Sequence, residues 1–187
     1  MIVFRESLLA GLLALAFIAP SQAADQSFCS DDPRYPAPED EDLVFYLQLS
    51  DKTDTVVYVV NRRADGTVDP SDPVHVYWRW YEGAGQRREL TFLQRNLAFG
   101  VQLTPSKDHP GDYVARLNAY PNIPVVVNET ADGSVRAFMT IASKPAQLIC
   151  VYVERRQQFG FLPQVLYIDF FGRTVDGGEK VVGRLKP

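Results

Sequence analysis

The chain has 187 residues, with 19 lysines and arginines, 23 aspartates and glutamates, and a formal net charge of −4. This mild acidity argues against nucleic-acid binding, which needs a basic face to displace counterions, and against a polybasic membrane patch. The length fits one ordinary domain that can bury a real core.

Residues 1–23 have the parts of a secretory signal peptide. Arg5 precedes an apolar run over residues 8–19, and small residues stand just before a cleavage point between Ala23 and Ala24. A membrane anchor is the alternative, but 12 apolar residues rise only about 18 Å as a helix, whereas a bilayer core needs roughly 30 Å. We expect residues 1–23 to be removed, leaving a periplasmic or secreted protein without an integral membrane segment.

Two cysteines, Cys29 and Cys150, predict one disulfide in an exported protein. A reactive thiol beside a base is the alternative. A lipid-modified Cys29 is disfavoured because the residues before it are not the small apolar set that such a site requires. Residues 24–42 are acidic and proline-rich, which predicts a tether that packs no core and is held to the sheet by Cys29.

Residues 43–187 read as a single β domain. Apolar and polar residues alternate over residues 43–49 and 74–80, and a β-branched run covers residues 56–60. Similar runs follow over residues 99–104, 112–119, 124–128, 134–142, 146–154, 164–172 and 179–185. Asp132-Gly133 and Asp176-Gly177-Gly178 separate pairs of these runs, as tight hairpins require.

One segment departs from this alternation. Leu90, Leu93 and Leu97 stand at i, i+3 and i+7, which predicts a short amphipathic helix over residues 89–97 that Gly100 could end. Another strand is the alternative, because residues 90–93 also suit a sheet.

Ten strand candidates with short links indicate an all-β fold. We expect an antiparallel meander of about 8–10 strands that forms a closed or nearly closed barrel, because long sheets curl and closure removes unpaired edges. A two-sheet sandwich is the alternative, since the pattern does not separate the two.

Three segments carry a resemblance to a known family. They are Pro-Val-His-Val-Tyr-Trp (73–78), Leu-Thr-Phe-Leu-Gln-Arg (90–95) and Ala-Phe-Gly (98–100). In these the chain resembles a family of exported bacterial proteins with a domain of unknown function, from residue 43 to the C-terminus. The resemblance implies a bacterial protein with a periplasmic location. It carries no known activity, catalytic residue or ligand.

No catalytic or cofactor motif stands out. The sequence has no Gly-x-Ser-x-Gly elbow, and the spacing of His75 and His109 does not demand a metal. Asp65, Asp69 and Asp72 are more typical of turns than of a calcium loop. We expect no cofactor, no metal site and no identified catalytic residue. Carboxylates that could serve a glycosidase are Glu82, Glu89, Glu154 and Asp169.

The best candidate surface comes from strand faces that mix aromatic and charged residues. Its members are His75, Tyr77, Arg79, Tyr81, Gln94, Arg95, Tyr152, Tyr167 and Asp169. If these faces line a barrel lumen or mouth, they form an aromatic, arginine-containing pocket for a small planar or anionic molecule. The alternative is an ordinary solvated sheet surface, where such pairs need no ligand.

Three functions remain open at this stage. The first is a non-enzymatic periplasmic protein that binds a small molecule, in which Arg79→Ala weakens binding while the fold survives. The second is an interaction or structural module of the cell envelope, anchored on a partner protein by Trp78 or Trp80. The third is a carboxylate-based hydrolase that acts on envelope polymers.

Overall fold

The computed structural model describes residues 29–30, 32, 34–156 and 163–187, and it confirms the all-β prediction. The strands are β1 (Leu43–Leu49), β2 (Thr55–Val60), β3 (Val74–Trp80), β4 (Gln86–Glu89), β5 (Val101–Pro105), β6 (Tyr113–Leu117), β7 (Tyr120–Glu129), β8 (Val135–Ile141), β9 (Lys144–Arg156), β10 (Gln164–Thr174) and β11 (Lys180–Leu185). A short 3-10 turn (Tyr81–Gly83) follows β3, and α1 (Phe92–Gln94) continues into a π-helical turn (Arg95–Phe99) before β5. We call residues 92–99 the helical segment.

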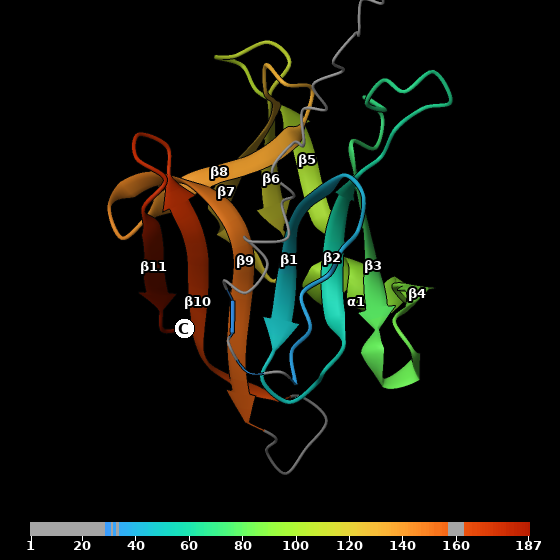
Figure 1. The fold of residues 1–187 in the computed structure, drawn as a ribbon, viewed down its shortest axis with the longest axis vertical. Coiled ribbons are helices and arrows are strands. Elements are labelled where there is room, and N and C mark those ends of the chain that lie inside the picture. The colour runs from blue at the N-terminus through green and yellow to red at the C-terminus, as the bar shows by residue number, and fades with distance from the viewer. Residues whose placement is uncertain (1–28, 31, 33, 157–162) are drawn as a thin grey trace, which may run out of the picture.

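All eleven strands belong to one sheet, in which the long strand β9 is the junction (Figure 1). On one edge, β9 pairs first with β8 and then with β1, and on the other edge it pairs along its length with β10. β11 pairs only with β10, and the path β4-β3-β2-β1-β9-β8-β7-β6-β5 runs from edge to edge. A single sheet replaces the two-sheet sandwich that the sequence left open.

One pairing departs from the expected antiparallel meander. β1 and β9 run parallel, with Tyr46 opposite Cys150 and Leu49 opposite Val153. The chain leaves β1 through β2, β3 and β4, and returns through β5 to β8 on the far side of the molecule. Four antiparallel pairings carry the chain from β5 to β9, so β9 keeps the direction of β5 and meets β1, which runs the same way, as a parallel pair.

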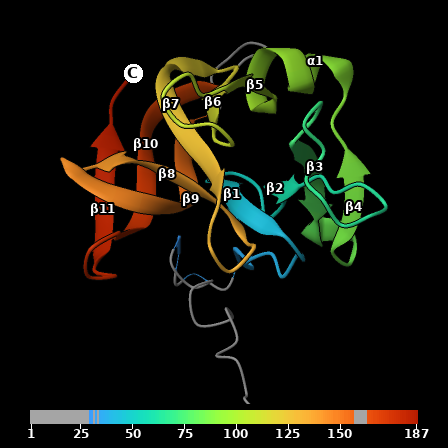
Figure 2. The ribbon, with the colours of Figure 1, turned by 90° about the horizontal axis from the view of Figure 1, so that it is seen from above.

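The sheet curls into a half-barrel instead of closing by hydrogen bonds. Its two path edges, β4 and β5, are consecutive in the chain and are joined by the helical segment. Seen from above, α1 lies between β5 and β4 on the open side of the curl (Figure 2). A helical bridge thus takes the place of the pairing that a closed barrel would make between β4 and β5.

The helix prediction is correct in kind but wrong in its boundaries and its buried face. Residues 86–89 form β4, and a capping box at Thr91 starts α1: the Thr91 hydroxyl accepts from the Gln94 N–H at 3.3 Å, while Gln94 Oε1 accepts from the Thr91 N–H at 3.0 Å. Leu90 is buried before the helix begins, whereas Leu93 and Leu97 are exposed. The leucine spacing therefore does not mark a core-facing stripe.

Close packing explains why the helical segment ends at a glycine. The Gly100 N–H donates to the Arg95 carbonyl at 3.0 Å, and a Cβ on Gly100 would lie 2.0 Å from that oxygen. The backbone of Gly100 is extended, with φ −64°, so the requirement is for space and not for a left-handed conformation.

The predicted hairpins at residues 132–133 and 176–178 are confirmed between β7 and β8 and between β10 and β11. Gly133 adopts φ +79°, which a side chain would resist. The predicted disulfide between Cys29 and Cys150 is present, with 121 residues of sequence separation. The predicted signal peptide and its Ala23–Ala24 cleavage point lie outside the described residues. Within the described part of the chain, no helix combines the length and apolarity needed to span a bilayer.

Candidate functional site

The concave side of the curled sheet encloses a cavity of about 330 Å³. One wall consists of alternate residues of β1, β9 and β10, namely Leu47, Leu49, Val151, Val153, Ile168 and Phe170. The opposite wall comes from the β5–β7 region and the helical segment, and it includes Leu117, Tyr120, Val125, Ala98 and Phe99. Because the two walls belong to opposite arms of the half-barrel, the curl itself creates the cavity.

Strand alternation explains why the cavity is apolar. Val151 and Val153 face inward, while Tyr152 and Glu154 between and beside them face the other side of the sheet. The same holds on β10, where Ile168 lines the cavity. On β9 and β10 these inward residues alternate with the aromatic and charged residues that the sequence singled out. The inward residues themselves were not predicted to belong to a site.

Arg155 is the one charged side chain among the described residues that line the cavity. It follows the last inward valine of β9, and its side chain is only 14% exposed. Its Nε donates to the Asp51 carboxylate, and its backbone N–H donates to the Ser50 hydroxyl at 3.0 Å. These contacts hold the Arg155 side chain, which lines the cavity, against the Asp51 carboxylate.

Tyr120 supplies a hydroxyl on the opposite wall. Desolvation by burial raises the pKa of this phenol further above neutral pH. A neutral phenol can both donate and accept a hydrogen bond.

The structure places the predicted row from β3 on the opposite, outer face. His75 lies 2.9 Å from the Glu89 carboxylate, and Tyr77 and Arg79 both donate to Asp40. Asp40 belongs to the N-terminal segment, by which we mean the described residues before β1. The Arg79 Nε reaches an Asp40 oxygen at 3.2 Å, and its Nη1 donates to the Gly85 carbonyl at 2.9 Å. This row binds the N-terminal segment to the sheet.

Tyr81, at the end of that row, flanks a shallow pocket beside Arg79 and Asp40. Burial raises the pKa of Tyr81 to about 12. Desolvation also raises the pKa of Tyr77, partly offset by the nearby Arg87 guanidinium.

A second predicted group, on β9 and β10, forms a separate cluster on the outer face. Asp169 accepts two hydrogen bonds of 2.7 Å from Arg184, whose guanidinium also lies 3.7 Å from the centre of the Tyr167 ring. Tyr152 donates to Glu154 at 2.9 Å, and its ring centre is 6.5 Å from that of Tyr167. Burial, followed by the hydrogen bond to Glu154, raises the pKa of Tyr152.

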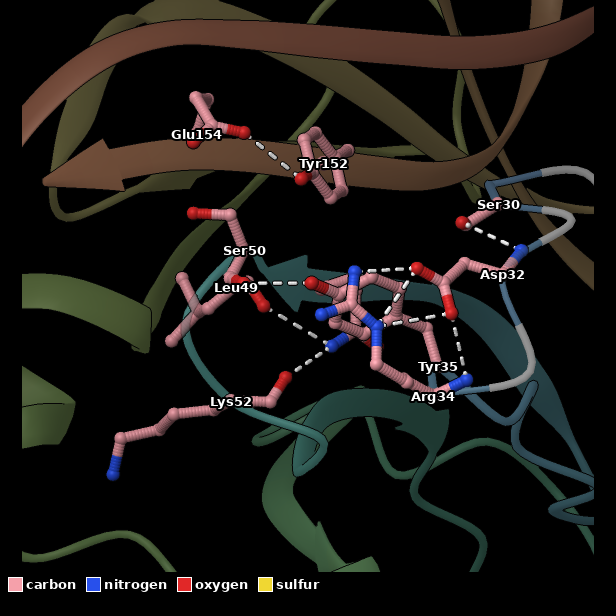
Figure 3. A network of polar contacts seen from close by, with 10 residues as sticks. Ser30, Asp32, Arg34, Tyr35, Leu49, Ser50, Lys52, Tyr152 and Glu154 are labelled. Atoms are coloured by element: carbon pink, nitrogen blue, oxygen red, sulfur yellow. Dashed lines mark hydrogen bonds and ion pairs between the residues drawn. The ribbon is translucent and has the colours of Figure 1, made fainter.

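The N-terminal segment also reaches this second cluster (Figure 3). Tyr35 donates to the Ser50 carbonyl at 2.6 Å and packs edge-on against Tyr152, with ring centres 6.2 Å apart. Cys29 is buried with Cys150 and Tyr46 on the same face. Residues expected to form an unpacked tether thus cover part of the sheet.

The last predicted pair, Gln94 and Arg95, belongs to the helical segment. Gln94 closes the capping box, and Arg95 lies 3.5 Å from the Glu89 carboxylate. The nine predicted residues are therefore divided between the β3 row, the β9–β10 cluster and the helical segment, and none of them lines the cavity. Their role in ligand binding stays a prediction.

The acidic loops act as turns. Asp65 accepts from the Thr67 N–H and Asp69 from the Ser71 N–H, both at 2.9 Å. In the portion of the chain that the structure describes, no three His, Cys, Asp or Glu side chains are grouped to hold a metal ion.

Comparison with protein families matches residues 45–184 to a family described as Domain of unknown function (DUF4833). Neither the curated proteins nor the solved structures give a match.

Proposed function

Because the chain belongs to the DUF4833 family, whose description assigns no activity, we propose a function from geometry: a non-enzymatic protein that holds a small amphipathic molecule in its cavity. The observation that carries this proposal is the apolar hollow of about 330 Å³ between the arms of the half-barrel. Ligand sites commonly have volumes of about 300–1,000 Å³ and are lined mainly by apolar residues with a few polar groups.

The apolar walls themselves support a bound ligand. Protein interiors rarely contain hollows larger than a water molecule, whereas this one has a volume of about 330 Å³. An apolar occupant would bury its own surface against the walls, which contributes about 0.8 kcal/mol for each methylene.

The walls indicate the chemistry of the occupant. Aliphatic side chains dominate, so the body of the ligand is a flexible or compact hydrocarbon and not the planar molecule expected from the tyrosine rows. Arg155 favours an anionic end group, such as a carboxylate, at one side of the cavity. A medium-chain fatty acid has both features and serves as the test probe.

We further propose that the protein acts after export to a bacterial periplasm. The Cys29–Cys150 disulfide supports an oxidising compartment, and the composition of residues 1–23 supports cleavage by a signal peptidase. An envelope location would also give the cavity access to membrane-derived apolar molecules.

Titration with saturated fatty acids tests the proposal. Trp78 packs edge-on against Phe99 with ring centres 5.0 Å apart, and Phe99 lines the cavity. In a Trp80→Phe variant Trp78 is the remaining tryptophan, so its fluorescence reports occupancy. We expect the Kd to fall about fourfold for each added methylene until the cavity is full. No binding of dodecanoate, or a Kd independent of chain length, would overturn the proposal.

Two neighbouring valines of β7 give matched variants. Val125 is 2% exposed and lines the cavity, whereas Val126 is half-buried and lies on the alternate side of the strand. Val125→Phe fills the hollow and should weaken dodecanoate binding at least about tenfold. Val126→Phe adds the same volume away from the cavity and should leave the Kd unchanged.

A further inference from the structure

An exposed apolar patch lies on the helical segment. Its members, Phe92, Leu93 and Leu97, have exposed fractions of 80%, 65% and 71%. A sequence that merely needed a turn between β4 and β5 would place polar residues at such positions, since large apolar side chains in water are unfavourable. We call these three residues the apolar patch.

The apolar patch and the cavity are two sides of the same short segment. Ala98 and Phe99, which directly follow Leu97, line the cavity, while the patch faces away from it. The segment also bridges the open side of the half-barrel between β4 and β5 (Figure 2). The patch is therefore adjacent in sequence to Ala98 and Phe99. These two residues form the part of the cavity wall that is helical and not hydrogen-bonded sheet.

Three arginines lie close to the patch in the sequence of an otherwise acidic protein. Arg87 and Arg88 precede it on β4 and Arg95 lies within the segment, against a single carboxylate from Glu89. The Arg88 guanidinium stacks over the Trp80 ring at 3.2 Å, and Arg87 and Arg95 contact Glu89. The local excess of positive charge is complementary to an anionic surface.

We propose that the apolar patch docks the protein on an anionic phospholipid membrane, where the cavity exchanges its ligand with the bilayer. The inference rests on the proposed function for the exchange, whereas the docking is independent of it. Phe92, Leu93 and Leu97 would enter the acyl boundary, and the flanking arginines would lie among the phosphates.

The size of the patch favours a membrane over a protein partner. A stable protein interface buries about 800 Å² on each partner, which requires some 20–30 residues. Three large side chains on a projecting turn fall well short of that area. A projecting apolar group with a cationic border is typical of segments that lie in the membrane interface.

Vesicle co-sedimentation with the mature, disulfide-bonded chain tests the docking. We expect binding to phosphatidylcholine vesicles that contain phosphatidylglycerol, weaker binding in high salt, and little binding to phosphatidylcholine alone. The triple variant Phe92→Ser, Leu93→Ser, Leu97→Ser should lose about a hundredfold in vesicle affinity. The control variant Val175→Ser, Val182→Ser removes exposed apolar side chains elsewhere and should bind vesicles normally.

A second readout separates this inference from the proposed function. The triple variant should bind dodecanoate in solution with an unchanged Kd but transfer it to vesicles at least about tenfold more slowly. Equal vesicle binding by the triple variant and the wild type would overturn the docking and leave the proposed function standing. The docking would also be overturned if light scattering showed a wild-type dimer that the triple variant does not form, and if neither protein bound vesicles. If neither the wild type nor any variant bound dodecanoate while the wild type still bound vesicles, only the ligand proposal would be overturned.

Discussion

Arg79→Ala should destabilise the protein and leave ligand binding unchanged. The Asp40 side chain is only 4% exposed, and its carboxylate accepts hydrogen bonds from Arg79 and Tyr77. Removing the guanidinium leaves a buried carboxylate with the Tyr77 phenol and without its cation. Arg79 does not line the cavity, and it projects from the outer face of β3 towards Asp40. The sequence instead predicted Arg79 as a ligand contact whose removal weakens binding while the fold survives, and this variant distinguishes the two roles.

The size of the effect follows from the burial of the pair. Breaking a fully buried ion pair by removing one partner costs about 3–5 kcal/mol. Arg79 is 25% exposed, so water reaches the site more easily and we expect a loss of about 2–3 kcal/mol. With a urea dependence of roughly 2 kcal/mol per molar, the unfolding midpoint should fall by about 1–1.5 M.

Urea unfolding followed by circular dichroism measures this loss, and Asp40→Asn supplies the control. In the Asp40→Asn background an uncharged amide replaces the carboxylate, so Arg79→Ala should cost only about 1 kcal/mol. An unchanged midpoint in Arg79→Ala, or the same cost in both backgrounds, would refute the reasoning. A weaker dodecanoate affinity in a folded Arg79→Ala protein would restore the ligand-contact role.

Three further predictions concern the Cys29–Cys150 disulfide, ligand binding in the cavity and the pH dependence of stability. Replacing Cys29 and Cys150 with serine should lower the free energy of unfolding by up to about 5 kcal/mol, because the bond closes a loop of 121 residues; a loss under about 1 kcal/mol in urea would contradict a clamped N-terminal segment. Arg155→Gln should weaken binding of dodecanoate but not of dodecanol in calorimetry, and an equal loss for both would exclude charge recognition. Burial raises the pKa of Tyr81 to about 12, so the unfolded state loses this proton first and stability should fall as the pH rises from about 10 towards 12. Tyr81→Phe should flatten that fall in Tm, and an identical fall in both proteins would contradict it.

Local patterns predicted the local structure well. Alternation of apolar residues located the strands, and Asp132-Gly133 located a hairpin, because both signals depend on neighbouring residues. The pairing of Cys29 with Cys150 was also predictable, because the chain has two cysteines and a predicted signal peptide. Neighbours distant in sequence were not predictable: the parallel pairing of β1 with β9 depends on the path of the whole chain around the half-barrel.

The cavity could not be assigned from alternation alone. Alternation on β9 separates Val151 and Val153 from Tyr152, but it does not show which face becomes concave. The tyrosine and arginine rows were correctly grouped on shared faces, whereas their partner Asp40 was missed because residues 24–42 were expected not to pack. The leucine spacing predicted a helix but implied the wrong exposure for Leu93, since the segment bridges two strand edges and does not lie on a core.

The most direct test of the cavity as a ligand site is methyl NMR with bound dodecanoate. With protein labelled at isoleucine, leucine and valine methyls, nuclear Overhauser contacts from the ligand chain should reach Leu49, Val151 and Ile168, which line the cavity. Val57 and Val59, which form a small cluster with Tyr77, should show none. Contacts to those two valines, or to exposed Val182 instead of the cavity methyls, would contradict the account.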